Sequence, residues 1–255
     1  MKLHYRIIGS GSPQVLILHG LFGMSDNLQS FAKGLAEKNC SAILVDLRNH
    51  GHSPHSDQHT YAAMAADINE LMNDLGLQQP VVFGHSMGGK VVMQVLGDFP
   101  GAISKAIIVD IAPYKYPVHH REILNALLAV NLPTLKTRGE AEAILAAHIE
   151  DNSTRQFLLK NLYRKTADEF AWRFNLPILN AQIEEVGEPT WPTIPIQIPV
   201  LFIKGARSGY IDESRMGEIL QWYPHAQIVS IPDAAHWVHA DQPQLLLNTV
   251  LDFIS

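Results

Sequence analysis

Five short runs of apolar residues constrain the fold of this chain more than any other feature of its sequence. They are residues 15–18 (VLIL), 42–45 (AILV), 81–83 (VVF), 106–109 (AIIV) and 200–203 (VLFI). Each run is too short for a helix and has no polar residue to face water, which is typical of strands buried on both faces of a parallel sheet. Such a sheet needs helices on both of its faces.

Segments whose apolar residues recur with helical spacing alternate with these runs. The predicted helices cover residues 28–38, 61–75, 87–99, 212–222 and 243–254. Two more strands are predicted at residues 3–8 and 228–231. We therefore predict an α/β fold with a mostly parallel, twisted sheet and helices on both faces.

The alternation stops between residues 111 and 198. This stretch has four predicted helical segments and no convincing buried strand: residues 121–129, 140–150, 153–163 and 167–180. Long insertions with helices of their own are typical of caps over a site. We predict a split core, residues 1–112 and 198–255, and a helical cap subdomain, residues 113–197.

Composition and charge argue against several classes of function. The net charge is −6 and no basic run or face is evident, so we expect no nucleic-acid partner. No apolar stretch reaches the roughly 18 residues of a membrane span, and the first residues (MKLHYR) suggest a strand, not a signal peptide. The single cysteine, Cys40, permits no internal disulfide, and we expect a cytoplasmic protein.

Residues 84–88 (GHSMG) join a predicted strand to a predicted helix and match the G-x-S-x-G nucleophile elbow. The serine of this tight turn has a strained backbone, and the flanking Gly84 and Gly88 remove side chains that would clash there. We therefore predict Ser86 as a nucleophile. The alternative is a plain glycine-rich turn between strand and helix.

A serine hydroxyl near neutral pH needs a base, and we predict His236 in that role. His236 follows the last predicted strand, which is where a histidine would reach the carboxyl edge of the sheet. His239 is the competing candidate, with a solvated or supporting position as its alternative.

An acid must orient the histidine and offset the imidazolium charge. The usual position of this acid, shortly after the strand that follows the cap, is occupied by Gly209. Asp110 ends strand 106–109 at the functional edge of the sheet, and we predict it as the acid. Asp212, which has the sequence context of a helix start, is the alternative.

Two backbone amides should bind the oxyanion of an acyl-transfer reaction. We predict the Met87 amide, which follows the nucleophile, and the Leu21 amide, with Phe22 as the alternative donor. The aromatic residues that could line a substrate pocket are Phe22, Tyr114, Tyr116 and Trp237.

Two further polar clusters have structural interpretations. We interpret residues 46–53 (DLRNHGHS) as a loop brace in which Asp46 and Arg48 pair or bond to neighbouring backbone. Histidines are frequent in residues 50–59, but they lack a familiar ligand spacing, so we expect no metal site and no cofactor.

The pair His119 and His120 at the cap entrance has two interpretations, a solvated turn and a substrate contact.

Together these motifs resemble the α/β-hydrolase superfamily over nearly the whole chain, and in particular the YbfF-type bacterial esterases. The likeness is carried by residues 19–23 (HGLFG) with Asn27, 46–51 (DLRNHG), 84–89 (GHSMGG), 110–113 (DIAP), 205–210 (GARSGY) and 236–240 (HWVHA). The resemblance implies a Ser86, His236 and Asp110 triad that acts on short acyl esters and acyl thioesters. One departure is Ala234 and Ala235, where many relatives have glycine.

The leading hypothesis is therefore hydrolysis of small-molecule acyl esters by a serine esterase through an acyl-enzyme. Acyl-CoA thioesters are the alternative substrates, and carbon–carbon bond hydrolysis is a further alternative. Dehalogenases and epoxide hydrolases are excluded because they need a carboxylate at position 86. A ligand receptor built on the same fold is the alternative that is not an enzyme.

Overall fold

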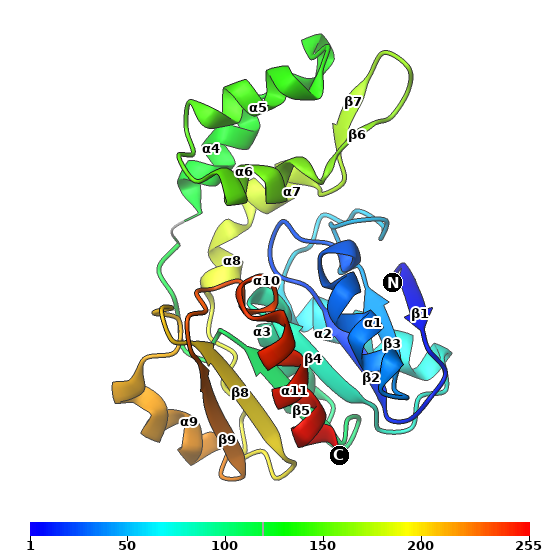
Figure 1. Ribbon diagram of the computed structural model, residues 1–255, viewed down its shortest axis with the longest axis vertical. Helices are drawn as coiled ribbons and strands as arrows, with labels where there is room; N and C mark the ends of the chain where they lie inside the picture. Colours follow the sequence, from blue (N-terminus) through cyan, green and yellow to red (C-terminus); the bar gives the residue numbers. More distant parts are fainter. Residues whose placement is uncertain (119) are drawn as a thin grey trace.

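The computed structural model describes residues 1–118 and 120–255. A seven-stranded sheet with the order β1-β3-β2-β4-β5-β8-β9 forms the core (Figure 1). All neighbouring strands are parallel except β1 and β3. The predicted fold class is confirmed. The strands are β1 (Tyr5–Ile8), β2 (Gln14–Leu18), β3 (Ser41–Val45), β4 (Val81–His85), β5 (Lys105–Val109), β8 (Val200–Gly205) and β9 (Ala226–Ile231).

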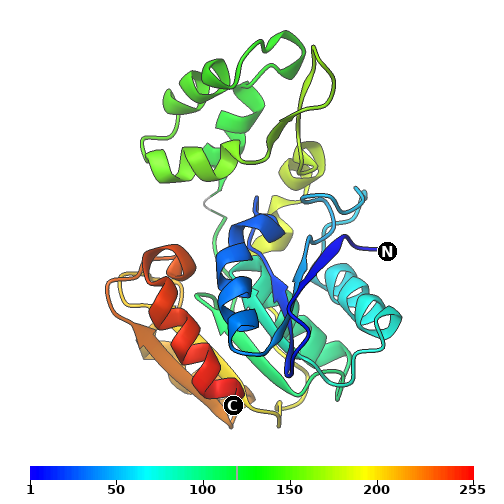
Figure 2. The same ribbon diagram turned by 45° about the vertical axis from the view of Figure 1, so that its right-hand side comes forward.

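Helices cover both faces of the sheet, as the apolar runs require (Figure 2). On one face α1 (Gln29–Glu37) and α11 (Pro243–Ile254) pack against alternate residues of the strands. On the other face lie α2 (Tyr61–Asp74), α3 (Met87–Asp98) and α9 (Met216–Trp222). The central strands are buried on both sides, which explains their lack of polar alternation. Short helical turns complete the core: η1 (Ser25–Leu28), η3 (Glu213–Arg215) and α10 (Val238–Asp241).

A separate group of elements stands above the sheet in Figure 1, between β5 and β8 in the chain. Its helices are α4 (Arg121–Ala129), η2 (Leu132–Thr134), α5 (Arg138–Ala146), α6 (Asn152–Leu159), α7 (Leu176–Ala181) and α8 (Ile183–Gly187). These elements fall inside the predicted cap, whose boundaries at residues 113 and 197 stay a prediction. We use the name cap for this group below.

The cap also contains an antiparallel hairpin, β6 (Leu162–Arg164) and β7 (Phe170–Trp172). The expectation that this mostly helical stretch has no buried strand, and the predicted helix over residues 167–180, were therefore wrong. Phe170 and Trp172 are buried on one side of β7, and aromatic residues favour strands where they can pack on a neighbouring layer. Three residues per strand are too few to show this alternation clearly in the sequence.

None of the helices within residues 1–118 and 120–255 has the length and apolar character needed to cross a membrane.

Candidate active site

Ser86 lies at the sharp turn between β4 and α3, with φ 53° and ψ −120°. Positive φ is uncommon for a residue with a side chain and indicates local strain. Glycine is needed on both sides, because a Cβ on Gly84 would lie 2.3 Å from the Gly88 carbonyl oxygen. A Cβ on Gly88 would lie 2.6 Å from the Leu18 carbonyl oxygen. This geometry matches the predicted nucleophile elbow.

The structure brings Ser86, His236 and Asp110 together, although they lie on three separate segments. His236 Nε2 is 3.0 Å from Ser86 Oγ, and His236 Nδ1 is 2.8 Å from Asp110 Oδ2. A carboxylate only accepts, so Nδ1 carries the proton and Nε2 is free to accept the Ser86 hydroxyl proton. This is the arrangement that a serine nucleophile needs.

Asp110 is fully buried at the end of β5 and is held in place by several donors. Its Oδ1 accepts the Gly205 backbone N–H at 2.9 Å, and its Oδ2 accepts the Ser208 hydroxyl. Asp212 lies elsewhere, exposed at the start of η3, where its carboxylate caps the turn by accepting the Ser214 N–H and hydroxyl. These bonds hold the pKa of Asp212 below its usual value. The structure therefore places Asp110, not Asp212, against the histidine.

The ring and backbone of His236 have their own supports. The Tyr210 ring stacks on the His236 imidazole, with centroids 4.2 Å apart and planes 24° apart. His85 Nε2–H donates to the His236 carbonyl oxygen at 2.8 Å. His239 is half-buried with its ring edge-on to His85, and desolvation lowers its pKa to about 4. His239 is thus a neutral packing residue of the histidine loop.

The predicted oxyanion donors lie beside Ser86, but they differ in availability. The Phe22 N–H donates to His50 Nε2 at 3.2 Å. Within the part of the chain that the structure describes, neither the Leu21 nor the Met87 N–H has a protein acceptor. Leu21 and Met87 are therefore the better candidates, with Met87 at the first position of α3.

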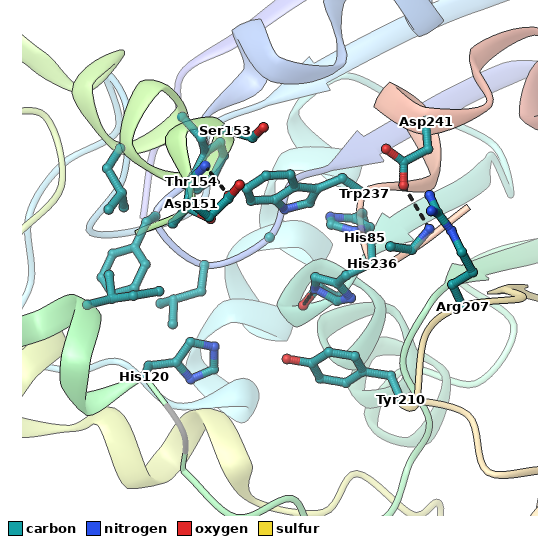
Figure 3. Close-up of a pocket in the computed structure, with 18 residues that line it drawn as sticks. His85, His120, Asp151, Ser153, Thr154, Arg207, Tyr210, His236, Trp237 and Asp241 are labelled. Atoms are coloured by element: carbon teal, nitrogen blue, oxygen red, sulfur yellow. Dashed lines mark hydrogen bonds between the residues drawn. The ribbon is translucent and has the colours of Figure 1, made fainter. Parts of the chain in front are cut away.

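Two cavities meet at Ser86. The larger has a volume of about 560 Å³ and lies between core and cap (Figure 3). In this view Tyr210, His236 and Trp237 come from the core, and the cap contributes His120 and a polar group around Asp151. The smaller cavity, about 20 Å³, is lined mainly by apolar and aromatic residues: Leu21, Tyr61, Met87, Ile111, Tyr116, Pro117, Val118, Val186 and Tyr210.

The predicted pocket residues divide between these spaces. Phe22 and Trp237 line the larger cavity, and Tyr116 lines the smaller one. The prediction for Tyr114 was wrong, because its ring is buried and its hydroxyl donates to the Tyr210 carbonyl oxygen at 2.9 Å. Tyr114 therefore supports the segment that carries Tyr210 and does not face substrate space.

The loop of residues 46–53 braces the site by two separate sets of bonds. Asp46 accepts the backbone N–H groups of Ser25 at 2.7 Å and His52 at 2.8 Å. Arg48 pairs with Asp67 on α2, with 2.6 Å between Nε and Oδ2. Asp46 and Arg48 thus brace different neighbours and do not pair with each other.

Several site residues had no predicted role, namely His85, Ser208, Tyr210 and Arg207. His85 and Tyr210 lie within segments that resemble the esterase motifs, and this is the only signal that could have found them. His120 lines both cavities, as the substrate-contact interpretation expects, whereas His119 lies outside the described residues. Within residues 1–118 and 120–255, no three His, Cys, Asp or Glu side chains lie close enough together to hold a metal ion.

Known proteins resemble this chain in sequence and in fold. The family model described as "alpha/beta hydrolase fold" matches residues 13–243. Esterase YbfF of Escherichia coli (strain K12) is 37% identical over 248 residues, which cover 96% of this chain and 94% of that protein. The sn-1-specific diacylglycerol lipase ABHD11 of Mus musculus is 34% identical over 264 residues, which cover 100% of this chain and 86% of that protein. A solved structure described as a marine microorganism esterase has a TM-score of 0.96 and 37% identity, and 99% of each chain is covered.

Proposed function

Because this chain belongs to the α/β-hydrolase family and is an enzyme of its serine esterase type, we propose that it hydrolyses short- to medium-chain carboxylic esters through an acyl-enzyme on Ser86. One observation carries the proposal. An unbroken chain of hydrogen bonds runs from Ser86 Oγ through His236 to the buried Asp110.

In the first half of the reaction Ser86 Oγ attacks the ester carbonyl carbon while His236 Nε2 takes the hydroxyl proton. The carbonyl π electrons move to its oxygen, and the Leu21 and Met87 N–H groups bind the resulting oxyanion. Asp110 stabilises the imidazolium through Nδ1–H. The C–O bond to the alcohol then breaks, and His236 gives its proton to the departing oxygen.

In the second half a water molecule attacks the acyl carbon, and His236 again takes the proton. Collapse of the second tetrahedral intermediate breaks the bond to Ser86 Oγ, which recovers its proton from His236. The products are a carboxylic acid and an alcohol, and the site returns to its starting protonation state.

The two cavities suggest where each half of the ester binds. The departing oxygen must reach His236 Nε2 to receive its proton, and His236 lines the larger cavity only. The alcohol half therefore belongs in the larger cavity. The acyl half then points toward the smaller cavity beside Leu21 and Met87, whose size favours a short acyl chain.

A fluorophosphonate probe together with a panel of p-nitrophenyl esters of graded acyl length tests this proposal. We expect the probe to label Ser86, the Ser86→Ala variant to resist labelling, and turnover to fall as the acyl chain lengthens. Folded protein that is neither labelled nor active on any ester would overturn the proposal and favour a ligand receptor on the same fold.

Acyl-CoA thioesters are the second candidate substrates. The same steps cleave a C–S bond, and the larger cavity, whose wall includes the exposed Arg207, has room on the side where a large leaving group would lie. Thiol release from acyl-CoAs, compared with hydrolysis of oxygen esters of the same acyl group, decides between the two. A higher kcat/KM on the thioester would favour the second candidate.

A further inference from the structure

We propose that Asn161 of the cap and His50 of the core are positioning residues for the oxyanion hole, because together they hold Phe22 by its C=O and N–H. The inference rests on the proposed function, since it concerns how the Leu21 amide is presented to the reacting carbonyl. Under this inference the cap contributes to catalysis through Asn161, in addition to forming part of the cavity wall.

The turn that presents Leu21 has an unusual residue at its third position. The Gly23 N–H donates to the Gly20 carbonyl oxygen at 2.9 Å, so Leu21 and Phe22 are the two central residues of a β-turn. Phe22 has φ 57°, and a positive φ at this position is the type II geometry, where glycine is the usual residue. A bulky aromatic residue keeps this conformation only where its surroundings hold it.

His50 holds one side of Phe22. It is fully buried, and its Nδ1 lies 3.0 Å from the Arg48 carbonyl oxygen, which can only accept. Nδ1 therefore carries the proton, and Nε2 is left to accept the Phe22 N–H. Burial and the neighbouring His19 and His59 hold the pKa of His50 well below its usual value, so the ring stays a neutral acceptor.

Asn161 holds the other side of Phe22 from the cap. Its Nδ2 donates to the Phe22 carbonyl oxygen at 2.8 Å across 139 positions of sequence. Asn161 is fully buried between α6 and β6, and its own backbone is fixed by bonds to Leu158 and Arg173. If the Asn161 amide were flipped, its Oδ1 would face the Phe22 carbonyl oxygen, and two acceptors cannot form a hydrogen bond. The contact therefore identifies Nδ2 as the atom that faces Phe22.

With both backbone groups of Phe22 engaged, its amide is unavailable to substrate and the turn has one arrangement. The adjacent Leu21 N–H is then the group that the turn presents beside Ser86. The Leu21 N–H belongs to the Gly20–Leu21 peptide, so loss of either partner acts on it indirectly. Phe22 can then relax toward negative φ, the turn loses its single arrangement, and the Leu21 amide is no longer held in one position beside Ser86. Phe174 of the cap adds an edge-on ring contact with Phe22, with centroids 5.4 Å apart.

The Asn161→Leu variant tests the cap side, because it removes the donor with little change in volume. We expect kcat to fall roughly 10- to 100-fold, less than the roughly 10²–10³-fold lost when an oxyanion donor is removed outright, with KM little changed. Affinity for a trifluoromethyl ketone, whose adduct carries the oxyanion, should fall in parallel with kcat. Asn175→Leu is the matched control, because Asn175 ties the cap to Asn49 and Ser56 without touching Phe22.

His50 provides a second, independent pair of variants should Asn161→Leu fail to fold. His50→Gln can place an acceptor near the former Nε2 position, whereas His50→Leu has none. We expect His50→Gln to retain more kcat and more ketone affinity than His50→Leu at equal thermal stability. Equal losses in both variants would overturn the assignment of His50.

The outcomes separate this inference from the proposed function. Wild-type protein without ester turnover or Ser86 labelling would overturn the function itself. Active wild-type protein with an Asn161→Leu variant that keeps its kcat and ketone affinity would overturn only the positioning role. Equal losses in Asn161→Leu and Asn175→Leu would do the same, since they would reflect general attachment of the cap.

Discussion

The carboxylate of Asp110 illustrates how single residues are constrained at this site. It is inaccessible to solvent and accepts from Gly205, Ser208 and His236 at once. These donors replace the hydration that the carboxylate loses on burial. In the proposed reaction Asp110 orients His236, and this role can be tested by substitution.

Asp110→Asn should lower kcat by roughly 10⁴-fold, because an amide can stabilise the wrong tautomer of His236 and cannot offset the imidazolium charge. Ester hydrolysis under saturating substrate measures this loss. Asp212→Asn is the control and should leave kcat nearly unchanged, since Asp212 only caps η3. The reverse pattern would assign the acid to Asp212.

At the level of elements, the elbow depends on close approach between β2, β4 and α3. Gly88 in the first turn of α3 lies against the carbonyl oxygens of Leu18 and His19, at the end of β2. The same contact therefore sets the distance between Ser86 and the turn that carries Leu21. The contact at Gly88 therefore constrains both the packing of α3 and the geometry of the proposed oxyanion hole.

Gly88→Ala should destabilise the protein by about 1–3 kcal/mol and reduce turnover further, because the new Cβ would push α3 away from β2. Gly217→Ala in α9 is the matched control. Among the described residues, only chain neighbours and the α9 backbone lie within 4 Å of a Cβ at Gly217, so this change should stabilise the protein by about 0.4–1 kcal/mol. Chemical denaturation of both variants measures the difference, and equal effects would contradict the packing argument.

Lys90 connects α3 to both ends of the cap. Its ammonium is buried and donates to the carbonyl oxygens of Tyr114 at 3.0 Å and Glu188. Burial lowers the pKa of Lys90 to about 7, although the nearby negative charge of Glu188 raises it in part. The folded state therefore binds fewer protons than the unfolded state between about pH 7 and pH 10.5.

The free energy of unfolding should therefore rise with pH through that window. Lys90 causes this rise, because its deprotonation in the folded state removes the cost of the buried charge. Below about pH 7 both states are protonated and the contribution is constant. Denaturation from pH 6 to pH 10 should show a steeper rise in wild-type protein than in Lys90→Met. Parallel curves would contradict the lowered pKa.

For the whole molecule, the position of the cap matters because it forms part of the wall around Ser86. The larger cavity takes its walls from both the core and the cap, including Ile123 on α4. The smaller cavity also borders Ser86, but it has Met87 in its wall and not His236. Substrate size should therefore be selected separately for the two halves of an ester.

Ile123→Trp should reduce kcat/KM roughly 10-fold or more for acetate esters of bulky alcohols, because the ring would fill the space for the leaving group. Acetate esters of small alcohols should be affected little. Leu128→Trp, on the exposed side of the same helix, is the control. A loss that follows acyl length instead of alcohol size would reverse the assignment of the two cavities.

The sequence was most informative where the constraint is local. Buried strands need continuous apolar runs, and a strand–turn–helix elbow needs glycine beside Ser86, so both leave short patterns in the chain. The absence of an acid at Gly209 likewise pointed to Asp110. The β6–β7 hairpin left too short a pattern to predict, and the positions of Tyr114 and Tyr210 depend on packing between distant segments.

The family, the parallel sheet and a small set of reactive residues can thus be predicted from the amino-acid sequence. How these residues meet depends on long-range packing, and the turn that carries Leu21 illustrates the reason. Phe22 keeps its positive φ through His50 and Asn161, which lie 28 and 139 positions away. Contacts between residues so far apart are made by the folded chain, and no local pattern around Phe22 records them.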